Sequence, residues 1–123
     1  MLGERDSVLR LVKQLAELIA RALKLASAEK TDEALAILRA ACGQALGMEH
    51  EVLSMLGAKS AIELLGDRTR VTAFIQLVEA MRDVDVRANE VLRARTRYQH
   101  ALELAEAAGD HEFAARLWAK LSA

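Results

Sequence analysis

Proline is missing from this 123-residue sequence, and aromatic residues make up only 3% of it. Proline breaks helix interiors, so its absence leaves every position open to a helix. Few aromatic residues also argue against a strand-rich protein. Alanine and leucine, which favour helices, occupy 24 and 20 positions, and six glycines remain as the main breaks between elements. We therefore predict an all-α protein.

The chain has one cysteine, Cys42, so it cannot form a disulfide within itself. Alanines precede Cys42, and a small buried thiol fits such a position in a helical core. A chain of 123 residues is long enough to bury a core without a disulfide or a metal ion. We expect one helical domain over residues 1–123, in a reducing compartment.

An excess of either charge is also missing, because 17 basic and 18 acidic residues give a formal net charge of -1. A near-neutral chain has no long-range attraction for nucleic acid or anionic lipid. The sequence shows no charged-then-apolar leader and no apolar run approaching the roughly 18 residues of a membrane span. We expect a soluble, cytoplasmic protein that binds no membrane.

Apolar residues recur at helical spacing along the chain and predict helices over most of it. Asp6 or Ser7 can cap the first helix. One of its apolar stripes contains Leu11, Leu15, Leu18, Ala22 and Leu25, and a second beside it contains Val8, Val12, Leu15, Ile19, Ala22 and Ala26. Two stripes need cover on two sides, from other helices of the chain or from a second copy. The predicted helices cover residues 7–28, 32–46, 48–56, 60–65, 67–82, 85–108 and 110–121.

Three of the predicted boundaries rest on specific residues. Asp83–Asp85 is the weakest helix-forming spot between residues 67 and 108, so we predict a turn there, with one continuous helix as the alternative. Ser60–Glu63 has the pattern of a capping box that opens a short helix. Gly109 can end one helix in the left-handed conformation, and Asp110 can cap the next. We interpret this last pair as a joint and not as a site.

Two predicted helix pairs resemble tetratricopeptide repeats. Leu18, Ala22 and Leu25 precede Ala34 in the small-and-large pattern that lets paired helices pack closely. The segment "YQHALELAEAAGD", residues 98–110, resembles the end of one repeat running into the next. The chain is also similar to an uncharacterised bacterial family of short helical proteins. The resemblance implies an array of antiparallel helix hairpins, a fold that generally serves protein–protein binding.

The sequence departs from the repeat pattern in several places. Arg82 and Asp85 stand where the pattern has small and then aromatic residues, and the usual proline after the second helix is missing. Residues 48–66 insert a broken segment of short helices between the two hairpins. We therefore predict a repeat-like bundle or array that is interrupted in the middle.

No group of residues predicts a catalytic, metal or cofactor site. No histidine has a glutamate three residues before it, which is a common pairing in helical metal sites. We interpret His50 as solvated polar surface, and His100 with Glu103 as a surface hydrogen bond. Cys42 stands where a small core residue is wanted, so we do not interpret it as a nucleophile. We assign no catalytic residue, no metal and no cofactor, and we predict that the protein is not an enzyme.

The densest basic stretch holds five arginines and suggests an anionic partner. Guanidinium groups bind carboxylates and phosphates bidentately, so Arg87, Arg93 and Arg97 are candidate contacts. Alternatively, these arginines form ion pairs within their own helices, because Asp83 and Glu90 stand at helical spacing from Arg87 and Arg93. We favour the second interpretation, and nucleic-acid binding is the least favoured function.

Large apolar residues of the first and last helices carry the most functional information. They are either core or interface, and aromatic residues are enriched at interface centres. We expect a non-enzymatic interaction or scaffold protein that forms a homodimer and binds a protein partner of unknown identity. The alternative is a regulatory module that holds a small ligand in an apolar pocket. The candidate interface residues are Leu11, Leu15, Leu18, Leu25, Phe113 and Trp118.

Overall fold

The structure is a computed structural model that describes the backbone of residues 2–122 and the side chains of residues 8–120. Within that range the chain forms helices and no strand, which confirms the predicted all-α fold with a broken middle segment. The first helix begins at Leu2 and not near residue 7, so the predicted caps lie inside it; their side chains are outside the described ones. The helices are α1 (Leu2–Ser27), α2 (Thr31–Leu46), α3 (His50–Met55), α4 (Ala58–Leu65), α5 (Arg68–Arg87), α6 (Val91–Ala107) and α7 (His111–Ser122).

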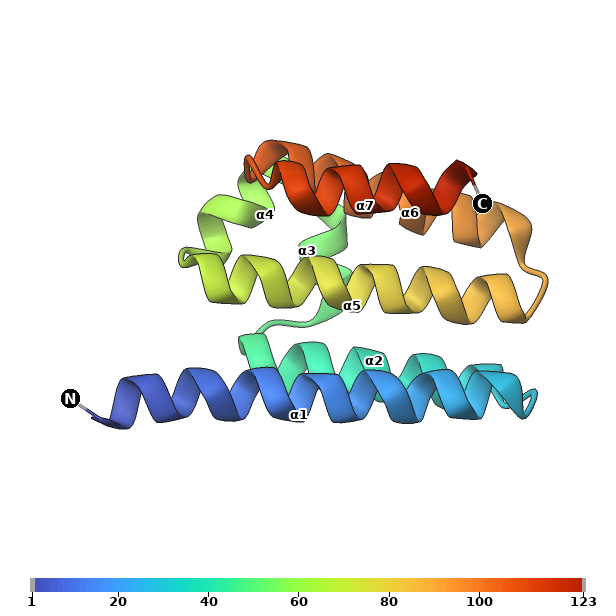
Figure 1. Ribbon diagram of the computed structural model, residues 1–123, viewed down its shortest axis with the longest axis horizontal. Helices are drawn as coiled ribbons and strands as arrows, with labels where there is room; N and C mark the ends of the chain where they lie inside the picture. Colours follow the sequence, from blue (N-terminus) through green and yellow to red (C-terminus); the bar gives the residue numbers. More distant parts are fainter. Residues whose placement is uncertain (1, 123) are drawn as a thin grey trace.

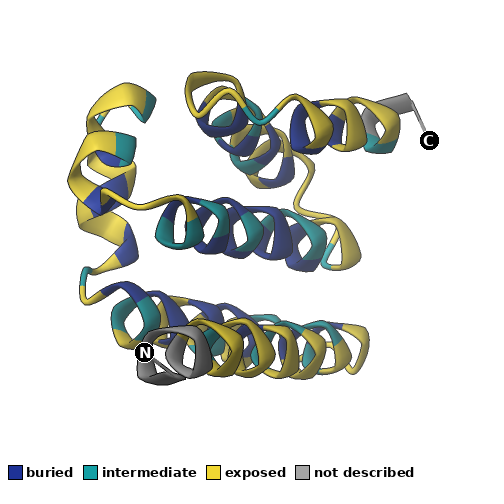
Figure 2. Ribbon diagram, turned by 60° about the vertical axis from the view of Figure 1, so that its left-hand side comes forward, coloured by how far each residue is buried: buried dark blue, intermediate teal, exposed yellow. Residues whose placement is uncertain are grey.

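Two antiparallel hairpins form the body of the protein. Helices α1 and α2 make the first hairpin and α5 and α6 the second, with α7 beside α6 (Figure 1). The short helices α3 and α4 connect the hairpins on one side, where α4 packs against α6 (Figure 2). Helix α5 therefore lies between an α1–α2 layer and an α6–α7 layer.

Helix α5 is the centre of the hydrophobic core. It contacts α1, α2 and α6 and carries buried residues along its length (Figure 2). Burying one large apolar side chain contributes roughly 1.5–3 kcal/mol, so this helix concentrates much of the stabilisation. Its large apolar side chains that are fully buried are Phe74, Ile75, Leu77, Val78, Met81 and Val84.

The turn between α5 and α6 falls at residues 88–90, so the predicted turn at Asp83–Asp85 is wrong. Asn89 has a left-handed φ of 60°, which asparagine tolerates better than most residues. Weak helix propensity costs only about 0.5 kcal/mol per residue, and tertiary contacts outweigh it here. Val84 is fully buried and the flanking acids both bind cations. The region is a hairpin, and one continuous helix is excluded.

The other two boundary predictions had opposite outcomes. The Gly109–Asp110 joint is confirmed: Gly109 has a φ of 71°, and Asp110 Oδ1 accepts a hydrogen bond from the Phe113 amide at 3.1 Å. The capping box at Ser60–Glu63 is wrong, because α4 already begins at Ala58 and no side chain caps it.

Asp85 is a fully buried acid whose charge is balanced by two arginines of α6. Its Oδ2 atom accepts a hydrogen bond from Arg97 Nε at 2.7 Å, and its Oδ1 atom lies 3.4 Å from Arg93 Nη2. Arg97 Nη1 also reaches the sulfur of Met81 at 3.3 Å. A buried carboxylate is tolerated only with such partners, so the cluster fixes how α5 and α6 sit against each other.

Replacing Arg97 with methionine tests this buried ion pair. Arg97→Met leaves the Asp85 carboxylate buried beside the half-exposed Arg93 alone. We expect the free energy of unfolding to fall by about 3–5 kcal/mol, measured by urea denaturation at neutral pH.

Arg95→Met is the matched control, because Arg95 is an exposed arginine of the same helix. Its effect should stay within about 0.5 kcal/mol. The double variant Asp85→Leu/Arg97→Met removes both charges and should regain most of the lost stability. Equal losses for Arg95→Met and Arg97→Met would contradict the role given to the pair.

Candidate functional site

One strip of α5 lies between α1 and α7; within it Ala80 is buried and the other residues are exposed or partly exposed. Its residues are three or four apart and therefore share one face of the helix: Arg68, Thr72, Gln76, Ala80 and Asp83. Three hollows lie along this strip, and neighbouring hollows share lining residues. We call the three hollows together the α5 groove.

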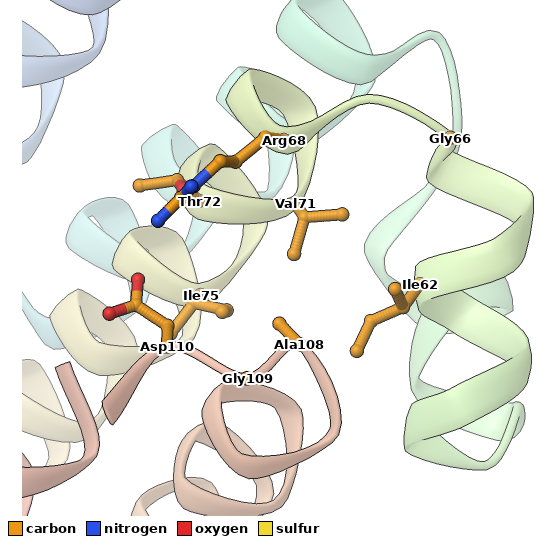
Figure 3. Close-up of a pocket in the computed structure, with 9 residues that line it drawn as sticks. All are labelled: Ile62, Gly66, Arg68, Val71, Thr72, Ile75, Ala108, Gly109 and Asp110. Atoms are coloured by element: carbon orange, nitrogen blue, oxygen red, sulfur yellow. The ribbon is translucent and has the colours of Figure 1, made fainter. Parts of the chain in front are cut away.

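The first hollow lies where α4, the start of α5 and the α6–α7 joint meet, and has a volume of about 290 Å³ (Figure 3). Ile62, Val71 and Ile75 give it an apolar interior. Arg68 and Asp110 line the side of the hollow away from Ile62, where the ends of their side chains point toward each other (Figure 3). This hollow forms one end of the groove. Asp110 caps α7, so the joint between α6 and α7 maintains the shape of this end.

The second and third hollows extend the groove along α1, with volumes of about 310 and 380 Å³. The first and second share Arg68 and Thr72, and the second and third share Val12 and Gln76. The groove is therefore continuous along α5. From Arg68 to Asp83 it spans about 22 Å, at the helical rise of about 1.5 Å per residue.

Helix α1 forms an apolar wall of this groove. The alternating spacing of three and four residues along this wall is that of a coiled-coil seam. Two of its members are more than half exposed, with Leu9 at 61% and Val12 at 54%. A neighbouring stripe, which includes Leu15 and Ala22, is buried in the core. We call the first stripe the α1 seam; its residues are Leu9, Val12, Ala16, Ile19 and Leu23. All of them except Leu9 line the groove, and Ile19 and Leu23 are partly buried.

Ion pairs between α5 and α7 close the far end of the groove. Glu79 Oε1 lies 2.9 Å from Arg116 Nη2, and Glu79 Oε2 lies 2.9 Å from Lys120 Nζ. Lys120 Nζ also lies 3.0 Å from Asp83 Oδ2. Glu79 is buried, and its two cationic partners compensate for the loss of water. These contacts hold α7 in place as the second wall.

The structure divides the six interface candidates. Leu15 and Phe113 lie in the core, and Leu18 and Leu25 pack half-buried against it. Leu11 is half-buried and lines the second hollow of the groove, whereas Trp118 is 52% exposed. The sequence did show Val8 and Val12 as part of a second stripe, but these residues were not chosen as candidates.

The three candidate arginines bind groups within the chain, although not the predicted ones. Arg87 Nη1 donates a hydrogen bond to the carbonyl oxygen of Leu23 at 2.6 Å, and Arg93 and Arg97 share Asp85. The expected helical pairs with Asp83 and Glu90 do not form among the described residues. These arginines connect α6 to α5 and α5 to the end of α1.

His50, which the sequence placed at the surface, is buried, and His100 is half-buried with its ring against Phe74, so the surface interpretation is wrong. The ring centroids of His50 and His100 lie 6.2 and 5.8 Å from that of Phe74. His50 Nε2 and Ser54 Oγ are hydrogen-bonded at 3.1 Å. Within residues 8–120, His50 Nδ1 and His100 Nε2 have no hydrogen-bond partner. Both rings therefore serve as packing groups around Phe74.

Burial keeps these two histidines neutral. Burial lowers the pKa of His50 to about 4, and the positive charges of Arg97 and Arg39 act in the same direction. Burial also lowers the pKa of His100, while Glu103 opposes this effect. A charged form of either ring would be poorly solvated at these positions and is therefore disfavoured.

Comparisons with known proteins found no relative: no family model, no curated protein and no solved structure matches the chain. The resemblance to tetratricopeptide repeats therefore stays a prediction. In the part of the chain that the structure describes, no three His, Cys, Asp or Glu side chains gather as a metal site would require. None of the described helices combines the length and apolarity needed to cross a membrane.

The buried His50 predicts acid sensitivity. Its pKa is 6.5 unfolded and about 4 folded, so the unfolded state binds more protons between these values. Its contribution to stability is complete above pH 6.5 and is lost as the pH falls toward 4. Urea denaturation at about pH 7.5 and about pH 4.5 should show a smaller loss for His50→Gln than for the wild type.

His111→Gln is the control for this experiment, because His111 is exposed at the start of α7. This variant should keep the pH dependence of the wild type. Identical pH dependence in all three proteins would contradict the buried, neutral state of His50.

Proposed function

We propose that this chain is a non-enzymatic protein-interaction or assembly module that pairs with a second copy of itself through the α1 seam. The observation that carries the proposal is the seam, four of whose five apolar positions line a groove about 22 Å long. An amphipathic helix lying in an apolar groove is a recurrent mode of protein recognition. Helix α1 has the apolar pattern that such a groove requires.

The seam suits a second α1 helix that runs in the opposite direction. It is centred on Ala16, and this small side chain lets two helices approach closely. In a two-fold symmetric pair, Ala16 meets the second copy's Ala16, and Leu9 meets the second copy's Leu23. One contact then covers the seams of both copies.

Charged residues beside the seam support the antiparallel direction. Lys13 and Glu17 are exposed and lie within one turn of Ala16. Antiparallel pairing brings Lys13 of one copy near Glu17 of the other, and symmetry produces this contact twice. The polar residues Thr72 and Gln76 of α5 line the groove next to the incoming helix.

We place this module in the cytoplasm and treat its hairpins as tetratricopeptide-like. Cys42 is buried and its Sγ donates to the Met48 carbonyl oxygen at 3.5 Å. Burial raises the pKa of this thiol to about 11, so it stays protonated and unreactive. A thiol that packs in this way suits a reducing compartment, and paired helix hairpins suit a binding scaffold.

Light scattering after size exclusion tests the self-pairing. We expect a mass of twice the 13.5 kDa of one chain at micromolar concentrations. Val12→Glu places an unpaired charge in both copies of the seam, so the dimer dissociation constant should rise at least ~100-fold.

Val52→Glu is the matched control, because Val52 is a similarly exposed valine on α3, outside the groove. This variant should remain a dimer, and both variants should melt cooperatively. A wild-type protein that stays monomeric at high concentration, or a Val12→Glu variant that stays dimeric, would overturn the proposal.

A further inference from the structure

A fourth hollow lies on the α5–α6 hairpin and shares no lining residue with the α5 groove. Its volume is about 370 Å³, at the lower end of the ~300–1,000 Å³ range of small-molecule sites. Val86, Val91 and Ala94 line its apolar part, and the two valines are exposed. The charged side chains that line it are both arginines, Arg82 and Arg95.

Tyr98, which also lines this hollow, carries a polar group that the chain does not satisfy. The residue is only 8% exposed, and its hydroxyl oxygen has no hydrogen-bond partner among the described residues. Burial raises the pKa of Tyr98, while Arg82 opposes this effect, so the hydroxyl remains a protonated donor at neutral pH. A buried donor without an acceptor is destabilising, and an acceptor from a ligand would relieve this.

The two lining arginines keep donors available for a ligand. Arg82 Nη1 lies 2.9 Å from Oδ1 of the neighbouring Asp83. The remaining N–H donors of its guanidinium group are left for a ligand. Arg95 is exposed and makes no ion pair within the described residues. Arg87, Arg93 and Arg97 of the same hairpin are instead bound to groups of the chain. Positive charge and hydrogen-bond donors thus meet an apolar surface at this hollow.

We propose that the hollow binds a small aliphatic carboxylate. The carboxylate would accept hydrogen bonds from the guanidinium groups of Arg82 and Arg95 and from the Tyr98 hydroxyl, and the aliphatic tail would cover Val86 and Val91. Guanidinium groups match the planar geometry of a carboxylate, and a hydrogen bond to a charged group is stronger than one between neutral groups. This site is independent of self-pairing through the α1 seam.

Isothermal titration with octanoate, using the full chain, tests the proposal. Octanoate should bind, whereas acetate, which lacks the tail, and octan-1-ol, which lacks the charge, should bind at least tenfold more weakly. No octanoate binding, or equal binding of octanoate and octan-1-ol, would overturn the proposal.

Two variants separate binding from folding. Tyr98→Phe and Arg95→Gln should each weaken octanoate binding about tenfold, whereas Arg21→Gln, at an exposed arginine of α1, should bind as the wild type does. Tyr98→Phe should also melt at or above the wild-type temperature, because it removes an unsatisfied hydroxyl. Wild-type affinity in Tyr98→Phe and Arg95→Gln would show that the octanoate binds elsewhere and would overturn the proposal.

Discussion

The burial of helix α5 is the constraint on which the rest of this protein depends. A helix that is apolar around most of its circumference must be covered on most of its sides. Here α1 and α2 cover it from one layer and α6 from the other (Figure 1). The same helix carries the buried acids Glu79 and Asp85, which need cationic partners. Its sequence therefore requires both apolar neighbours and the basic residues that α6 and α7 supply.

Local patterns were sufficient for most of the fold because most helices here are amphipathic. Apolar spacing predicted the long helices, and the Gly109–Asp110 joint was predicted from residues that act on their own backbone. The prediction of a turn at Asp83–Asp85 was wrong because Asp85 is held in its helix by Arg97, twelve residues away. Helix propensities describe single residues and take no account of such a contact between helices. Asn89, which tolerates a left-handed φ, was the one local signal for the true turn.

The sequence predicted the apolar residues of the groove but not which of them are exposed. Two apolar stripes of α1 were evident, yet which stripe packs inside depends on where α2 and α5 lie. The structure buries Leu15 and leaves Val12 exposed, a distinction that periodicity cannot make. The interior position of His50 was hidden for the same reason. Its contact is Phe74, a residue of another helix, and no spacing rule links the two.

The arginines of the α5–α6 hairpin show how structural and functional residues can be told apart by physical means. A guanidinium group has five N–H donors and a permanent charge. Where a carbonyl or a buried carboxylate of the chain takes up that capacity, as for Arg87 and Arg97, the residue serves the fold. Arg95 instead lies beside an apolar hollow and a buried hydroxyl without a partner. The same distinction applies to the α1 seam, where Leu9 and Val12 carry apolar area that the fold leaves exposed. In a small helical protein, the residues whose binding capacity the fold does not use are therefore the ones to examine for function.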